Sequence, residues 1–249
     1  MDKVVNQIDS IVLWLREKVE SANAKGLVVG VSGGIDSAVV SGLIKKAFPN
    51  NSLGIIMPCH SNPQDAQDAL DVVRAVELKH LTLDITKAHD AILSPVKEDL
   101  TGAGFSDINL KLSDANLRAR LRMSTLYSVA NALNYLVVGT DNAAEVHTGY
   151  FTKYGDGGVD ILPISQFLKR EVRALAEGLG IPRHIITKAP SAGLWAGQTD
   201  EAEMGVTYDE IDNYLSGQEV SAQAARVIER LNSRTAHKRV MPPAYPRNE

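Results

Sequence analysis

The stretch Gly30-Val31-Ser32-Gly33-Gly34-Ile35-Asp36-Ser37 is the most informative part of this 249-residue chain. It follows an apolar run at residues 27–29 and precedes a helix-like run at residues 38–44. A buried strand, a turn of small residues and a helix leave free backbone N–H groups at the helix N-terminus, where the helix dipole favours an anion. The two glycines allow the backbone to approach a phosphate closely, and the two serines add hydroxyl donors. We therefore expect a phosphate-binding loop, with a plain strand-to-helix turn as the alternative.

The acid in this loop points to a metal ion. A carboxylate repels phosphate unless a divalent cation lies between them, so Asp36 is a candidate Mg²⁺ ligand. The loop is not a Walker A sequence, because it lacks the Gly-Lys-Ser/Thr ending. The pattern Ser-Gly-Gly-x-Asp-Ser is similar instead to the signature of the N-type ATP pyrophosphatases, in which the α-phosphorus of ATP is attacked and pyrophosphate leaves.

Composition limits the classes of protein that fit. The net charge of −4 argues against a nucleic-acid partner, because a dedicated binder usually carries a basic face. No stretch approaches the roughly 18 apolar residues of a membrane span, and no N-terminal signal is recognisable. The single cysteine, Cys59, excludes an intrachain disulfide and Cys-cluster metal sites, so we expect a cytoplasmic protein. A small buried residue is the favoured role for Cys59, and a nucleophile is the alternative.

Hydrophobic periodicity predicts one α/β domain over residues 1–249. Strands are expected at residues 27–31, 53–57, 80–84 and 135–139, each of the first three followed by a helical pattern. Alternation of this kind indicates an open parallel sheet, here of about five strands, with helices on both faces and ligands at the carboxyl ends of the strands. Further helices are expected at residues 4–19, 63–76, 115–133, 169–179, 208–215 and 222–231, with an irregular stretch at 182–205.

Four later segments make the resemblance specific. Residues 139–145 read Gly-Thr-Asp-Asn-Ala-Ala-Glu, residues 151–158 read Phe-Thr-Lys-Tyr-Gly-Asp-Gly-Gly, residues 188–195 read Lys-Ala-Pro-Ser-Ala-Gly-Leu-Trp, and residues 237–239 read His-Lys-Arg. With the first loop, in this order, they resemble the ammonia-dependent NAD⁺ synthetases over essentially the whole chain. The resemblance implies an adenine nucleotide α hydrolase-like fold, a homodimer, and ATP-dependent amidation of deamido-NAD⁺ by ammonia through an acyl adenylate, giving NAD⁺, AMP and pyrophosphate.

The resemblance also assigns site residues. It implies Mg²⁺ ligands at Asp36 and Glu145, with ATP as co-substrate, and catalytic roles for Asp36, Lys169 and Lys188, the last as a phosphate ligand on a closing loop. The ATP-binding positions it implies are Gly30, Val31, Ser32, Gly33, Gly34, Ile35, Asp36, Ser37, Thr140, Lys169 and Ser191. The deamido-NAD⁺-binding positions it implies are Arg120, Lys153, Asp160, His237 and Lys238.

Several of these residues also fit roles outside a binding site. Arg120 and Lys169 could be solvated charges on helices, His237 and Lys238 a solvated tail, and Glu145 a surface acid. His60 could be a turn residue or line the nucleotide pocket, and Trp195 is expected to cover ligand. One departure from the family pattern is Asn142, where His is frequent; Asn keeps hydrogen-bonding capacity but cannot become a cation.

Competing functions fit less well. Thiolating enzymes typically need paired cysteines, GMP synthetase normally carries glutaminase and dimerisation domains, and a non-catalytic nucleotide sensor would need neither Glu145 nor residues 151–158.

Overall fold

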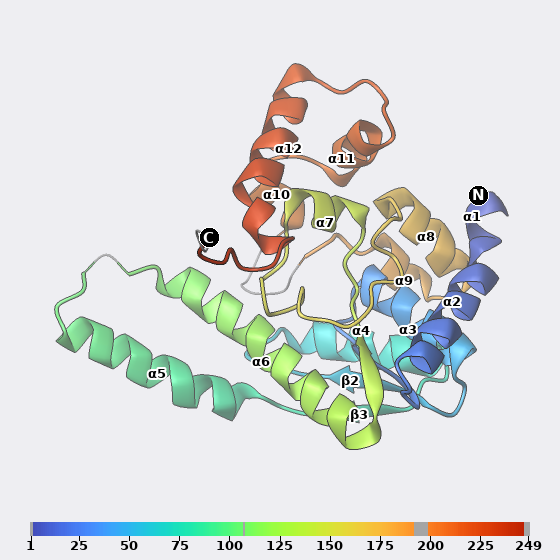
Figure 1. Cartoon of the computed structure of the whole chain (residues 1–249), viewed down its shortest axis with the longest axis horizontal. Coiled ribbons are helices and arrows are strands. Elements are labelled where there is room, and N and C mark those ends of the chain that lie inside the picture. The colour runs from blue at the N-terminus through green and yellow to red at the C-terminus, as the bar shows by residue number, and fades with distance from the viewer. Residues whose placement is uncertain (1, 107, 192–198, 247–249) are drawn as a thin grey trace.

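A four-stranded parallel sheet forms the centre of the computed structural model, which describes residues 2–106, 108–191 and 199–246 (Figure 1). Its strands are β1 (Gly26–Gly30), β2 (Ser52–Ile56), β3 (His80–Thr82) and β4 (Tyr135–Val138), in the order β3-β2-β1-β4. The predicted fold class is confirmed. Where about five strands were expected, the described residues form four, and a single parallel bridge from Val138 to Ile161 lies beyond β4.

Side chains of β1 alternate between two apolar cores. Leu27 and Val29 belong to the core on one face of the sheet, and Val28 belongs to the core on the other. All three are fully buried. Because successive side chains of a strand point to opposite faces, a strand that is apolar throughout must be covered on both sides.

Helices provide that cover. The first core packs under α2 (Gln7–Ser21), α3 (Ile35–Ala47), α4 (Pro63–Ala75) and α8 (Lys169–Gly178). The second packs under α6 (Leu110–Leu133), which projects from the body together with α5 (Thr86–Gly102), at the left of Figure 1. The short α1 (Asp2–Val5) precedes α2. Ile8, Ile11, Val12, Leu15 and Val19 of α2 are buried in the chain's own core, whereas Leu13 faces solvent.

A third group of helices lies above the carboxyl ends of the strands (Figure 1). It comprises α7 (Ala143–Thr148), α10 (Asp200–Met204), α11 (Tyr208–Leu215) and α12 (Ala222–Arg234), followed by the 3₁₀ turn η1 (Ala236–Lys238). Buried apolar residues of these elements, Tyr208 and Ile228 among them, form a separate small core. The expected irregular stretch at 182–205 is partly helical, since it contains α9 (Arg183–Thr187) and α10; residues 192–198, including Trp195, lie outside the described residues.

Strand order places the two motif loops side by side. The chain runs outward from β1 through β2 to β3, then returns to place β4 on the other side of β1. Ligands of open α/β sheets bind where the strand order reverses in this way. The loops after β1 and β4 therefore flank one crevice. No described helix has the length and apolarity needed to cross a lipid bilayer.

Candidate active site

The loop after β1 is braced by its own serines. Ser32 N–H donates to Ser37 Oγ (3.2 Å), Gly34 N–H donates to Ser32 Oγ (3.2 Å), and Ser37 Oγ donates to Gly34 O (2.9 Å). Gly33 has φ of +82°, and a Cβ there would lie 2.7 Å from the Asp65 carbonyl oxygen. Only glycine fits that conformation and that space. The loop thus arrives at α3 in a fixed shape, with the first N–H groups of the helix at its end.

A cavity of about 690 Å³ opens over this loop. It is bounded by the ends of β1 and β4, by α6 and by the loop that precedes α10. Of the ATP-binding positions implied by the resemblance, all except Gly33 line it: Gly30, Val31, Ser32, Gly34, Ile35, Asp36, Ser37, Thr140, Lys169 and Ser191. Glu145, Lys188 and Lys238 line it as well.

Two carboxylates and a buried lysine meet in this cavity. The Lys169 ammonium forms a short ion pair with Asp36 Oδ2 and lies 3.6 Å from Glu145 Oε1. Its side chain is only 2% exposed. Burial opposes the charge of Lys169, but the two carboxylates outweigh it and raise the pKa of the ammonium, which stays charged. We call these three residues the inner cluster.

Glu145 is held in the inner cluster by its helix and by a tyrosine. Its Oε2 accepts from the Asn142 backbone N–H (3.0 Å), and its Oε1 accepts from the Tyr208 hydroxyl (3.0 Å). Burial, and then the negative charge of Asp36, raises the pKa of Glu145 to about 7. A divalent cation bound between the two acids would relieve that repulsion, so the donor set fits a hard cation with oxygen ligands.

Asn142, where the resemblance leads us to expect His, makes three side-chain hydrogen bonds. Its Oδ1 accepts from the N–H groups of Ala144 (3.0 Å) and Glu145 (3.2 Å), which caps α7. Its Nδ2 donates to Asp36 Oδ1 (2.9 Å). The residue is fully buried. A neutral amide therefore ties the helix that carries Glu145 to the loop that carries Asp36.

Lys188 reaches across the cavity to α4. Its ammonium lies 2.5 Å from Asp68 Oδ2 and 2.8 Å from Asp65 Oδ1. Although burial opposes the charge, these two acids raise the pKa of Lys188. Despite its own burial, Asp68 has a lowered pKa because Lys188 and Gln64 donate to it. The predicted phosphate ligand is thus held by protein carboxylates in this structure.

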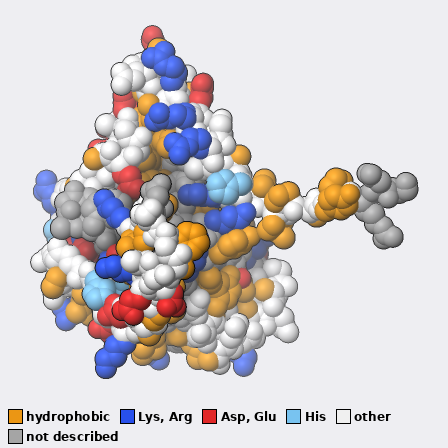
Figure 2. All heavy atoms as spheres, turned by 90° about the vertical axis from the view of Figure 1, so that its left-hand side faces the viewer, with side chains coloured by type: hydrophobic (Ala, Val, Ile, Leu, Met, Phe, Trp, Pro, Cys, Tyr) orange, Lys and Arg blue, Asp and Glu red, His pale blue; other side chains and the backbone are white. Residues whose placement is uncertain are grey.

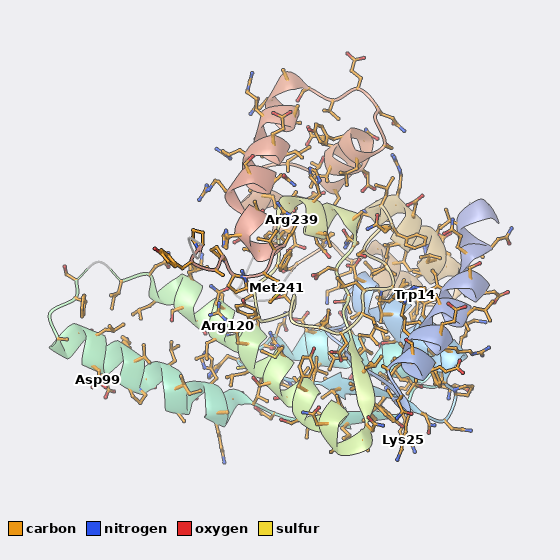
Figure 3. All side chains as sticks on the ribbon, in the orientation of Figure 1. Trp14, Lys25, Asp99, Arg120, Arg239 and Met241 are labelled. Atoms are coloured by element: carbon orange, nitrogen blue, oxygen red, sulfur yellow. The ribbon has the colours of Figure 1, made fainter. Side chains whose placement is uncertain are left out.

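Of the five residues expected at deamido-NAD⁺, only Lys238 lines the cavity. Arg120, Lys153 and His237 are linked to one another by hydrogen bonds outside it. Arg120 Nη2 donates to Lys153 O (3.4 Å), and Lys153 Nζ donates to His237 O (2.5 Å). Lys238 Nζ donates to the carbonyl oxygens of Gly149 (2.8 Å) and Phe151 (2.5 Å). Figure 3 shows Arg120 on α6 near the C-terminal segment that carries Met241. We call Arg120, Lys153, His237 and Lys238 the outer set.

Figure 2 views the molecule from the side on which α5 and α6 project, and the side chains on this face are of several types. Figure 2 shows Lys and Arg side chains gathered along the upper and central part of this face, with acidic and apolar side chains among them.

Asp160 lies apart from the outer set. Its Oδ2 accepts from the Val137 N–H (2.7 Å) and its Oδ1 accepts from the Tyr127 hydroxyl (2.9 Å). These contacts join the segment after β4 to the strand itself and to α6. In this chain the carboxylate therefore has a structural role at the edge of the sheet.

Sequence reasoning assigned no role to several residues that line the cavity. Arg122 lines it and holds the loop after β2 through Met57 O and Ser61 Oγ (both 3.3 Å). Asp141 is 6% exposed, and burial followed by the charge of Asp156 raises its pKa well above the usual range. Asp156 lines the cavity too. Asp141 and Asp156 both stand in the sequence motifs quoted above, so those motifs were the signal that could have identified them. The role of Arg122 had no local signal.

Cys59 and His60 can now be placed. Cys59 is fully buried, and desolvation raises the pKa of its thiol, as expected for a residue of the core and not for a nucleophile. His60 does not line the cavity and pairs instead with Asp90 on α5, where Nε2 lies 2.7 Å from Oδ1.

Comparison with known proteins matches almost the whole chain. A family model described as NAD synthase matches residues 7–242. The NH(3)-dependent NAD(+) synthetase of Alkaliphilus metalliredigens is 56% identical over 242 residues, covering 97% of this chain and 98% of that protein.

Two solved structures are also similar. One described as NMN synthetase from Francisella tularensis has a TM-score of 0.89 and 41% identity, covering 96% of this chain and 97% of that one. An NH3-dependent NAD synthetase from Campylobacter jejuni has a TM-score of 0.77 and 29% identity, covering 98% of each chain. With the ATP-loop geometry and the inner cluster at the switch point of the sheet, these matches mean that the chain belongs to the NAD synthase family.

Proposed function

We propose that this protein makes NAD⁺ from deamido-NAD⁺, ATP and ammonia. The nicotinate carboxylate attacks the α-phosphorus of ATP and pyrophosphate leaves, which forms an acyl adenylate. Ammonia then attacks the acyl carbon, AMP leaves with the bonding electrons, and the nitrogen loses a proton. The observation that carries the proposal is the inner cluster, which lies beside a helix N-terminus where triphosphate would bind.

The chain's own groups supply charge and position in this scheme. The N–H groups at the start of α3 and the serine hydroxyls bind phosphate oxygens, and Lys169 neutralises charge that develops during departure of pyrophosphate. Lys169 is fixed for this role because its backbone N–H donates to Asp212 Oδ1 (2.9 Å) and its ammonium lies 4.6 Å from the ring centre of Tyr208. No protein nucleophile is needed, since the substrate carboxylate and ammonia both attack.

Asp36 and Glu145 would hold Mg²⁺. Both offer carboxylate oxygens on opposite sides of the crevice, and this donor set suits that ion. When bound, the ion would stabilise the negative charge of the phosphates. Asn142 and Tyr208 orient the two carboxylates for this purpose.

Ammonia is the proposed nitrogen donor. A glutamine-hydrolysing module would need its own nucleophile and well over about a hundred residues. Residues 7–242 match the NAD synthase model, the Alkaliphilus metalliredigens relative matched over 98% of its length is named as NH(3)-dependent, and Cys59 is buried in the core. We propose that residues 1–249 act as one domain, in the cytoplasm, where ATP is made and used.

A homodimer is proposed from the α5–α6 projection. Apolar side chains there are exposed in the single chain, Ile92 by 44%, Phe105 by 60% and Leu112 by 56%. An obligate twofold interface buries about 2,000 Å² or more. Leu126 of α6 belongs to the core under that helix, so it is unsuited to the test. Sedimentation of Ile92→Glu/Phe105→Glu should show monomers, whereas Leu13→Glu, equally exposed but on α2, should not change the wild-type state.

A second candidate substrate is nicotinate mononucleotide. The similar Francisella tularensis structure is described as an NMN synthetase, and most of the outer set lies outside the cavity of the single chain. The test is pyrophosphate release with either substrate, with ATP, Mg²⁺ and ammonium present. We expect the higher kcat/KM with deamido-NAD⁺. A higher kcat/KM with nicotinate mononucleotide would make it the substrate in place of deamido-NAD⁺. No pyrophosphate release with either substrate would overturn the proposed reaction.

A further inference from the structure

Three side chains that the proposed reaction does not use converge beside the loop after β2. His60 lies in that loop, and His89 and Asp90 lie in the first turns of α5. One ligand atom from each, an imidazole nitrogen or a carboxylate oxygen, lies within 4.8 Å of the others. Asp90 Oδ1 is 2.7 Å from His60 Nε2 and 3.1 Å from His89 Nδ1.

His89 is oriented from behind by a second acid. The ring is buried, and its Nε2 lies 2.7 Å from Asp114 Oδ1 on α6. Arg118 fixes that carboxylate with two hydrogen bonds, from Nε to Oδ1 (2.8 Å) and from Nη2 to Oδ2 (2.7 Å). A carboxylate on the far nitrogen is the arrangement that holds imidazole ligands of metal ions, because it fixes both ring orientation and tautomer.

His60 is placed by an uncommon backbone conformation. Its φ is +49°, which few residues other than glycine adopt. The rings of His60 and His89 meet edge to face, with centroids 5.3 Å apart, so they do not stack. Both nitrogens are therefore directed at the same carboxylate oxygen from different elements of the fold.

We propose that His60, His89 and Asp90 bind a divalent transition-metal ion, with Zn²⁺ the best match. Two imidazoles and one carboxylate are a common set for zinc, and a fourth position would stay open to water. Metal bonds of about 2.0–2.2 Å separate tetrahedral ligand atoms by about 3.3–3.5 Å. The side chains of His60 and Asp90, 44% and 50% exposed, can make the small shift required.

The ion would join two walls of the active-site region. Pro58 and Ser61, on either side of His60 in the loop, line the cavity, whereas His89 and Asp90 belong to the projecting α5. Zinc would therefore stiffen the loop after β2, at a site distinct from the inner cluster.

Calorimetric titration of the full chain with Zn²⁺ tests the proposal. Excess Mg²⁺ is present so that zinc binding at Asp36 and Glu145 does not contribute to the measured heat. The wild type should bind one Zn²⁺ per chain, and His60→Asn should weaken that binding at least about tenfold. Asp114→Asn should weaken it by about 10- to 100-fold through loss of His89 orientation. His184→Asn is the matched control, since His184 is 53% exposed and also pairs with one acid, Asp71 (3.4 Å).

Long-range ¹H–¹⁵N spectra of the histidine rings identify the ligands directly. Zinc should shift the ring nitrogens of His60 and His89 and leave those of His184 in place. Asp90→Asn serves in place of His60→Asn if the metal-free thermal unfolding of the latter differs from wild type. Lack of zinc uptake by the wild type, or equal uptake by His60→Asn or its replacement, would overturn the proposal and leave a hydrogen-bonded network alone.

Discussion

The inner cluster and the outer set differ in how they are built. Lys169, Asp36 and Glu145 are nearly enclosed, and they lie in the first turns of three different helices. Hydrogen bonds to neighbouring groups hold Lys169 and Glu145 in place. In the outer set, Arg120 and His237 are more open to solvent, and the side chains of Arg120, Lys153 and Lys238 donate to backbone carbonyls. One half of the proposed site is rigid before substrate arrives, whereas the other half must exchange internal contacts for substrate contacts. Rate should depend on the first and affinity for the dinucleotide on the second.

Breaking the inner cluster should have the largest effect. Asp36→Asn or Glu145→Gln removes a proposed metal ligand with little change in volume, and we expect kcat to fall by at least about 10³-fold. Pyrophosphate release at saturating ATP and Mg²⁺ measures this. Near-normal rates in either variant would remove that residue from the proposed metal site.

The outer set should respond in a different kinetic constant. Lys153→Ala removes one proposed cationic contact, so KM for deamido-NAD⁺ should rise by about 10- to 100-fold while KM for ATP stays unchanged. Exposed Lys25, directly before β1, provides a control, since Lys25→Ala should change neither constant. An equal rise in both KM values would show that the two regions are not separable.

Removing the amide that orients the inner cluster should cost stability as well as rate. Asn142→Ala deletes the α7 cap and the donor to Asp36, and we expect the free energy of unfolding to fall by about 1–2 kcal/mol. Ser221→Ala, which removes the cap of α12 and touches none of the three cluster residues, should cost a similar stability without the loss of kcat. Denaturant unfolding and turnover compare the two, and equal turnover in both variants would deny Asn142 an orienting role.

Lys188 lines the same cavity as the inner cluster, and its ion pair with Asp68 gives a smaller, pH-dependent effect. Because the pKa of Asp68 is lower in the folded chain than its ordinary value, the pair stabilises the fold above that value. The contribution is lost as pH falls through the lowered folded pKa. Asp68→Asn should therefore lower the free energy of unfolding by about 1–2 kcal/mol at pH 7, with the gap to wild type closing below about pH 4. Asp71→Asn, on the same helix but more exposed, should change the free energy of unfolding little. A difference between Asp68→Asn and wild type that stays constant with pH would contradict the stabilising role of the Lys188–Asp68 ion pair.

The sequence predicted the inner parts of the molecule best. Strand β1, the loop after it and α3 each have a local sequence signal: an apolar run, a pair of glycines and the start of a helical pattern. The position of Asp36 at the helix N-terminus therefore follows from the sequence alone. The helix expected at residues 63–76 is likewise present as α4, and the structure adds a cap from Asn62, whose side chain accepts from the Gln64 N–H. Helices α9 and α10 are only five residues long and depend on tertiary packing, so periodicity missed them.

Contacts between distant elements could not be predicted. His60, His89 and Asp114 are separated by 25 residues or more, and only the packing of α5 against α6 and the β2 loop brings them together. The number of strands was also beyond the pattern, because the segment around Ile161 forms one bridge and not a ladder. The outer set was inferred from a resemblance, and its role in binding deamido-NAD⁺ stays a prediction.

The lysine between two acids has a consequence for how the enzyme is handled and purified. Since Lys169 already supplies a positive charge to Asp36 and Glu145, the polypeptide can fold with no metal present. Chelators such as EDTA should then arrest turnover reversibly and leave the melting temperature nearly unchanged, unlike a zinc finger, which loses its fold with its ion. Binding of nucleotide and Mg²⁺ would then exchange one positive counter-ion of Asp36 and Glu145 for another in a chain that is already folded.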